Sequence, residues 1–247
     1  MKINERILNK KNIDDQVIKV NKNKVHYIYT ANNIIPDNIC EEIIKYIEEF
    51  KSNKFGMQGT TLGKHLNKNM KNSYDIYMDP AFVKSQDKNF KNIFIGLYHA
   101  IFSYTHYYLC YTGNYGTDNI GISYDDWKKS KPIYYSKNIA WEDFCFRKYN
   151  ANKGAYFKPH FDKPIGNNRI LAGIIYLNKL NKGGSIVFPQ YNKKIKPDAG
   201  KLVIFPSNFT HLHYTEPSDT DRYCVVIHAR ELRNEIESNT PVLTIKE

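Results

Sequence analysis

The chain has 247 residues, and 41% of them are hydrophobic, which is enough to fill the core of one large domain or two small ones. Its formal net charge is +11, carried mainly by lysines that are spread along the sequence. Because nucleic-acid-binding proteins usually concentrate basic residues on one face, this spread permits a nucleic-acid partner without indicating one. No apolar run approaches the roughly 20 residues of a membrane span, and residues 1–20 lack the apolar core of a signal peptide. These features argue against a secreted or membrane-anchored protein.

The cysteines predict neither a zinc ribbon nor a disulfide framework. Cys40, Cys110, Cys145 and Cys224 lie far apart in the sequence and form no Cys-x-x-Cys pair. Thiols without a framework are typical of reducing compartments, so we expect a cytoplasmic protein. The oligomeric state is left open by these patterns.

The N-terminal part of the chain predicts a polar leader, a short strand and a helix. Residues 1–24 are rich in asparagine and lysine without sustained periodicity, which is typical of a partly ordered leader. Residues 25–30 predict a short strand. From Pro36 onward the apolar side chains recur at the spacing of one helix face. They are Ile39, Ile43, Ile44 and Ile47.

The next part predicts a loop and a long helix. Residues 51–75 hold three glycines among scattered lysines, which indicates a loop that can act as a mobile flap. Residues 85–111 contain no proline, and their aromatic and aliphatic side chains repeat with helical spacing. We expect this helix to pack its apolar stripe against one face of a sheet.

From residue 142 the pattern changes to short strands separated by turns rich in Asn, Lys, Gly, Pro and Asp. Short strands at this spacing predict a sandwich or a double-sheet jelly roll. The expected strands are 144–149, 155–161, 170–177, 184–188, 202–205, 209–214 and 223–228.

One strand carries a His-x-Asp pattern. His160 and Asp162 lie two apart, so in an extended strand both side chains point to the same face and can bind one metal ion. Alone, such a pair is more often a buried hydrogen-bonded pair than a metal site. A third ligand is available from His211 or His213. Two histidines and one carboxylate that leave open positions are the ligand set of non-haem Fe(II) oxygenases.

A basic residue begins the last predicted strand. Arg222 shares strand parity with Cys224, Val226 and His228, which indicates that it points to the same face as they do. An arginine on an inward face needs an anionic partner, and a carboxylate suits its fork of donors. The sequence therefore predicts a carboxylate-binding position at Arg222.

In this part, the chain resembles the prolyl 4-hydroxylase-like branch of the 2-oxoglutarate and Fe(II)-dependent dioxygenases. The order and the spacing of several motifs carry the resemblance, which covers about residues 142–230. The motifs occupy 149–154, 157–162, 175–178, 183–189, 200–207, 213–217 and 222–223.

The resemblance implies a mainly β, α+β fold with a double-stranded β-helix (jelly-roll) core that N-terminal helices buttress. It divides the chain into a leader at 1–24, a single dioxygenase domain at 25–235 and a tail at 236–247. Within the domain, residues 36–111 form the helical support and residues 142–230 form the core.

The resemblance also implies the cofactors and the site residues. Fe(II) is bound by His160, Asp162 and a distal histidine, and 2-oxoglutarate is bound with its far carboxylate at Arg222 and with a contact from Tyr149. Ascorbate is an optional cofactor in this interpretation. No catalytic residue beyond the metal site is expected. Side chains that could support these residues from behind are His211, Thr210 and Tyr156.

The distal histidine is assigned from the family pattern, because His211 and His213 have the same strand parity. In the family a proline follows this histidine four positions later and a basic residue about ten positions later. His213 meets both conditions with Pro217 and Arg222, whereas His211 has Thr215 at the first position. We therefore expect His213 to be the ligand and His211 to be a neighbour.

The implied activity is hydroxylation that depends on 2-oxoglutarate and O2 and yields succinate and CO2. A proline in a peptide or protein is the first substrate to consider. The alternatives are another side chain, such as lysine, or a nucleic-acid base. A non-catalytic jelly roll that only binds metal, or an RNA-associated module, is a different class of function. Arg222 argues against it, because a binding relic has no need of a co-substrate anchor.

Overall fold

The computed structural model describes residues 27–59, 70–111, 139–151, 156–163 and 168–231. The predicted leader, the C-terminal tail and residues 60–69 of the predicted flap lie outside these residues. The helices are α2 (Asp37–Ser52), α3 (Pro80–Ser85) and α4 (Lys88–Tyr111). The strands are β1 (Tyr29–Ala31), β2 (Met57–Gln58), β3 (Tyr74–Met78), β4 (Ile139–Trp141), β5 (Phe144–Tyr149), β6 (Phe157–His160), β7 (Arg169–Tyr176), β8 (Ile186–Phe188), β9 (Lys193–Ile195), β10 (Leu202–Pro206), β11 (His213–Thr215) and β12 (Arg222–Glu231).

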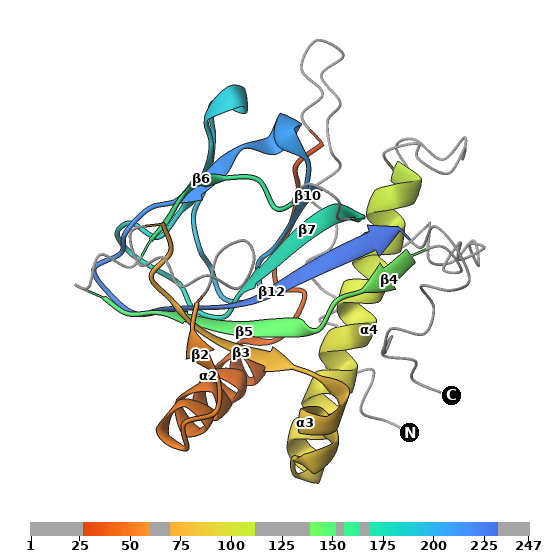
Figure 1. Cartoon of the computed structure of the whole chain (residues 1–247), viewed down its shortest axis with the longest axis vertical. Helices are drawn as coiled ribbons and strands as arrows, with labels where there is room; N and C mark the ends of the chain where they lie inside the picture. The colour runs from red at the N-terminus through yellow and green to blue at the C-terminus, as the bar shows by residue number, and fades with distance from the viewer. Residues whose placement is uncertain (1–26, 60–69, 112–138, 152–155, 164–167, 232–247) are drawn as a thin grey trace.

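Two antiparallel sheets form the core (Figure 1). The larger sheet has the order β1-β10-β7-β12-β5-β3-β2, with β4 paired to β12, and the smaller sheet has the order β6-β11-β8-β9. Neighbouring strands come from distant parts of the chain, as a jelly roll requires. The prediction of a mainly β protein with a double-sheet core and helical support is confirmed.

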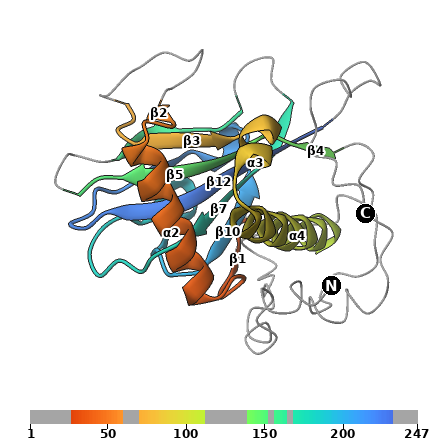
Figure 2. The ribbon, with the colours of Figure 1, turned by 90° about the horizontal axis from the view of Figure 1, so that it is seen from below.

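The helices cover one face of the larger sheet (Figure 2). Along β5 and β12, alternate side chains such as Phe146 and Val225 pack with residues of α2 and α4, while Tyr149 and Cys224 face the smaller sheet. This alternation follows from the two-residue period of a strand. One face of the sheet is thus supported by helices, and the other is free to form a site.

The helix boundaries follow from local capping. The predicted helix at 85–111 begins at Lys88, because the Asp87 carboxylate accepts a hydrogen bond from the Phe90 amide, a typical N-cap contact. The preceding helix α3 was not predicted, and the Asp79 side chain caps it in the same way. Within the described residues, no helix combines the length and the apolar character that crossing a lipid bilayer requires.

Four strands were missed, namely β2, β3, β4 and β9. β2, β4 and β9 have two or three residues each and carry little periodic signal, whereas β3 has five residues and lies between β5 and β2. The predicted strand at 209–214 is wrong in its first half. Phe209–His211 is one turn of 3-10 helix, and only His213–Thr215 pairs as a strand. The reason is local: the Asn208 side chain accepts a hydrogen bond from the Thr210 amide, which competes with strand pairing.

Candidate active site

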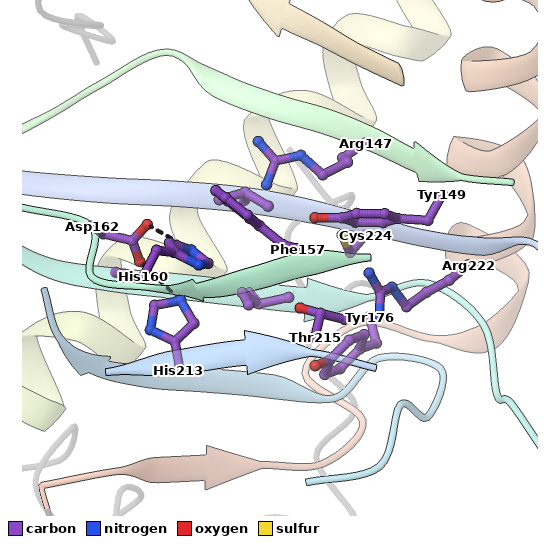
Figure 3. A pocket seen from close by; sticks show the side chains of 13 residues that line it. Arg147, Tyr149, Phe157, His160, Asp162, Tyr176, His213, Thr215, Arg222 and Cys224 are labelled. Atoms are coloured by element: carbon purple, nitrogen blue, oxygen red, sulfur yellow. Dashed lines mark ion pairs between the residues drawn. The ribbon is translucent and has the colours of Figure 1, made fainter. Parts of the chain in front are cut away.

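Two paired strands bring the candidate histidines together. β6 and β11 are antiparallel neighbours in the smaller sheet, and His160 lies directly opposite His213 in their register. Their ring centroids are 4.3 Å apart. Asp162 follows β6 by two residues and turns its carboxylate toward both rings (Figure 3). The potential ligand atoms of the three side chains all lie within 4.8 Å of one another.

Backbone carbonyls orient both imidazole rings. The Nδ1 atom of His160 lies 2.6 Å from the Lys158 carbonyl oxygen, and the Nδ1 atom of His213 lies 3.0 Å from the His211 carbonyl oxygen. A carbonyl only accepts hydrogen bonds, so each Nδ1 carries a proton and each Nε2 is the nitrogen that could bind a metal ion. The two Nε2 atoms lie on the side of Asp162, 3.7 Å and 3.5 Å from its carboxylate oxygens.

The protonation states of the triad suit a cation. Burial and the neighbouring His213 lower the pKa of His160 to about 3, so its imidazole is neutral at pH 7. Burial alone would raise the pKa of Asp162, but His213 and His228 hold it well below its usual value. Neutral imidazoles beside an ionised carboxylate are the forms that bind divalent metals. The donor set of two nitrogens and one carboxylate fits Fe(II).

Arg222 lies in the same cavity at the end away from the triad (Figure 3). It is 1% exposed, and its Nη1 donates a hydrogen bond to the Gly184 carbonyl oxygen at 2.7 Å. Its guanidinium lies 3.9 Å from the centre of the Tyr149 ring. Among the described residues its Nε has no hydrogen-bond partner and no carboxylate forms an ion pair with it. A buried guanidinium in this state is suited to an incoming carboxylate.

Gly184 makes room for this arginine. Its φ is +70°, a left-handed conformation that side chains rarely adopt. A Cβ at this position would lie 2.4 Å from a methyl carbon of Leu180 and 3.5 Å from the Cδ of Arg222. The glycine therefore lets the backbone approach Arg222 closely enough to accept its hydrogen bond.

Several residues of the cavity were missed from the sequence. Arg147, Tyr176 and Thr215 line it with the triad. His228 approaches Asp162, with 3.6 Å between its Nε2 and Oδ1 of the carboxylate. The parity of β12, which the sequence did reveal, could have placed His228 on the inward face. The others needed the pairing of strands to be known.

The residues predicted to support the site have different positions. Tyr149 lines the cavity, as expected of a cofactor contact. Thr210, His211 and Tyr156 do not line it. His211 is buried beside Tyr191, and its Nδ1 lies 2.8 Å from the Thr210 hydroxyl. The equal parity expected for the two histidines is wrong, since His211 ends a 3-10 turn, and its backbone carbonyl oxygen lies against Nδ1 of His213.

This difference predicts unequal effects of two alanine substitutions. His213→Ala removes an imidazole of the triad and is expected to abolish Fe(II) binding. His211→Ala keeps the carbonyl that orients His213 and is expected to retain binding within about tenfold, the mild end for a residue that only supports a ligand. Anaerobic titration with Fe(II), with thermal unfolding to verify folding, measures both. Binding that survives His213→Ala and disappears in His211→Ala would reverse the assignment.

Comparisons with known proteins agree with this architecture. Residues 144–230 match the model of the 2OG-Fe(II) oxygenase superfamily. No curated protein sequence matches the chain significantly. Among solved structures, a prolyl hydroxylase from Trichoplax adhaerens, in complex with a hypoxia inducible factor peptide fragment, superposes with a TM-score of 0.61 at 15% identity, covering 84% of each chain.

Two further structures are similar. A Pseudomonas putida prolyl-4-hydroxylase has a TM-score of 0.56 at 14% identity, with 84% of this chain and 94% of that chain covered. A viral collagen prolyl hydroxylase from Paramecium Bursaria Chlorella virus-1, in complex with 2OG, has a TM-score of 0.53 at 17% identity, with 83% and 97% covered. Identities this low establish the fold alone. By the match over residues 144–230 and by its fold, the chain is similar to the 2OG-Fe(II) oxygenase superfamily.

Proposed function

We propose that this protein hydroxylates a prolyl residue of a peptide or protein, with His160, Asp162 and His213 as the Fe(II) ligands and Arg222 as the anchor for one carboxylate of 2-oxoglutarate. The observation that carries the proposal is the convergence of the triad and a buried arginine without a carboxylate partner among the described residues, all in one cavity. When bound, Fe(II) and 2-oxoglutarate supply the oxidising chemistry, in which dioxygen hydroxylates the substrate and 2-oxoglutarate leaves as succinate and CO2.

The protein's own residues position and insulate these groups. The carbonyls of Lys158 and His211 hold the two imidazoles with Nε2 toward Asp162, where an Fe(II) ion would be bound. The cavity between the triad and Arg222 is walled in part by Ala172, Ile174 and Val226, whose apolar surfaces exclude water. Exclusion of water strengthens the attraction between Arg222 and a carboxylate, because the local dielectric constant is low.

The prolyl substrate is supported by the similarity of the fold to prolyl hydroxylases, one of them bound to a peptide. Another side chain, such as lysine, stays an alternative substrate that the peptide panel tests. A nucleic-acid base remains the other alternative substrate, because the formal net charge of +11 permits a nucleic-acid partner.

Mass spectrometry of a substrate panel tests the proposal. We expect a gain of one oxygen atom on proline-rich peptides, together with succinate, and no gain on lysine peptides or oligonucleotides. His160→Ala is the inactive control, because it keeps the fold and removes one ligand. Succinate formed without any modified peptide would support the oxygenase chemistry and refute the prolyl substrate. Neither product under any condition would favour the non-catalytic metal-binding module.

Two further expectations concern ascorbate and the location of the protein in the cell. Ascorbate is proposed as an optional cofactor, and it should raise the number of turnovers if Fe(II) oxidises during the reaction. The cytoplasmic location stays a prediction from cysteine usage, which fractionation of cells that express the full chain would check. The described cysteines Cys40, Cys145 and Cys224 are buried free thiols.

A further inference from the structure

A second arginine enters the cavity from the middle of the larger sheet. In the register of the strands, Asp75 on β3, Arg147 on β5, Cys224 on β12 and Tyr176 on β7 form one row across the sheet. Arg147, Cys224 and Tyr176 line the same cavity as the triad and Arg222. Figure 3 shows the Arg147 side chain extending over this wall next to Phe157. Arg147 is therefore part of the site by position.

Asp75 holds Arg147 in a fixed orientation. The Nε and Nη2 atoms of Arg147 donate to the two oxygens of the Asp75 carboxylate at 2.8 and 2.9 Å. The same carboxylate also accepts hydrogen bonds from Lys71 at 2.5 Å and from Ser73 at 2.8 Å. Among the described residues, Nη1 of Arg147 has no hydrogen-bond partner. A bidentate clamp leaves this third nitrogen as the donor that a ligand can use.

Two cations share one carboxylate in this cluster. Lys71 and Arg147 both pair with Asp75, and all three side chains are buried. Arg222 lies in the same cavity as Arg147 and has no carboxylate partner in the described part of the chain. A buried guanidinium without a carboxylate partner is costly, so the two arginines of the cavity are suited to a ligand with two negative charges.

We propose that Arg147 is a second binding residue for 2-oxoglutarate, one that contacts its 1-carboxylate while Arg222 contacts its 5-carboxylate. The inference rests on the proposed function only in taking 2-oxoglutarate as the co-substrate. The 1-carboxylate and the adjacent keto oxygen can chelate a metal ion, so this end of 2-oxoglutarate would lie nearer the metal ligands. Arg147 lines the cavity together with all three of those ligands, His160, Asp162 and His213. Each carboxylate of 2-oxoglutarate would then have its own guanidinium partner.

Two probes separate the two carboxylates. 2-Oxopentanoate keeps the 1-carboxylate and the keto group but lacks the 5-carboxylate, and 4-oxopentanoate keeps the 5-carboxylate but has a methyl group in place of the 1-carboxylate. Isothermal titration under anaerobic conditions, with Fe(II) bound, measures the affinity of each probe and of 2-oxoglutarate. Arg147→Gln is the main variant, because Lys71 still pairs with Asp75 after the change. Lys194→Gln, which removes an exposed charge on β9, is the matched control.

We expect Arg147→Gln to weaken 2-oxoglutarate and 2-oxopentanoate by about tenfold or more, as for the loss of a hydrogen bond to a charged group, and to leave 4-oxopentanoate unchanged. Arg222→Gln should give the opposite pattern, and Lys194→Gln should change nothing. Arg147→Lys keeps the charge without the fork, so a smaller loss with the same two ligands is expected. If thermal unfolding shows that Arg147→Gln is not folded, Arg147→Lys is used for the test instead.

The outcomes separate this inference from the proposed function. Wild-type protein that binds 2-oxoglutarate, with no selective loss in either Arg147 variant, overturns the inference and leaves the function standing. Equal weakening of both probes also overturns it, because a disturbed fold would act on both ends. Wild-type protein that binds no 2-oxoglutarate would refute both the role of Arg147 and the proposed function. If the Arg147 variants lose 2-oxoglutarate and 2-oxopentanoate selectively but no peptide is hydroxylated, the role of Arg147 is supported and only the prolyl substrate is refuted.

Discussion

Replacement of Asp162 by alanine is expected to abolish Fe(II) binding and, with it, all production of succinate. Asp162 supplies the only negative charge of the triad, and its carboxylate faces both His160 and His213. Without it, the triad keeps only its two imidazoles, and a divalent cation would enter a cavity whose other charged walls are positive. We expect the affinity for Fe(II) to fall by more than roughly 100-fold, beyond the range for residues that only orient a ligand.

The weak visible absorption of the anaerobic Fe(II) and 2-oxoglutarate complex measures this loss directly. His228→Ala is a graded comparison, because His228 contacts Asp162 without belonging to the triad, and a loss of roughly 10–100-fold is expected for such a supporting residue. Asp219→Ala removes an exposed carboxylate and should leave the spectrum unchanged. An Asp162→Ala protein that is folded and still shows the absorption would contradict the assignment of the metal site.

Replacement of Arg222 by glutamine is expected to raise the concentration of 2-oxoglutarate needed for half-maximal rate by roughly 100-fold, with a smaller change in kcat. The reason is the loss of a charge-assisted bidentate contact in a buried site, which contributes about 1.5–3 kcal/mol or more. The Tyr149 ring and the Gly184 carbonyl hold the guanidinium in place, so no neighbouring cation can substitute for it without rearrangement.

Arg222→Lys separates charge from geometry. Lysine keeps the positive charge but lacks the planar fork, so its requirement for 2-oxoglutarate should fall between those of the wild type and of the glutamine variant. Binding of Fe(II) alone should be similar in all three proteins, because Arg222 lies at the other end of the cavity from the triad (Figure 3). An unchanged KM for 2-oxoglutarate in a folded Arg222→Gln protein would refute the proposal that Arg222 binds this co-substrate.

Much of the fold could be predicted because its signals are local. The strand at 144–149 was predicted with its observed bounds, since alternating side chains and flanking turns lie within a few residues of one another. Helix α2 buries Cys40, Ile43, Ile47 and Phe50, close to the predicted stripe. Strand β3 was missed. Its buried Asp75 is compensated by the nearby Lys71 and by Arg147, which is 72 residues away in the sequence.

By itself, the sequence determined the class of the fold, the helical support and the residue types of the candidate site, because periodicity and motif spacing are properties of neighbouring residues. Only the tertiary structure decided which histidine faces His160, since the register of β6 and β11 and the 3-10 turn at Phe209–His211 depend on contacts between distant segments. It also decided that Arg147 enters the cavity. That position follows from the pairing of β3, β5 and β12, which joins strands whose order along the chain does not reveal their order in the sheet.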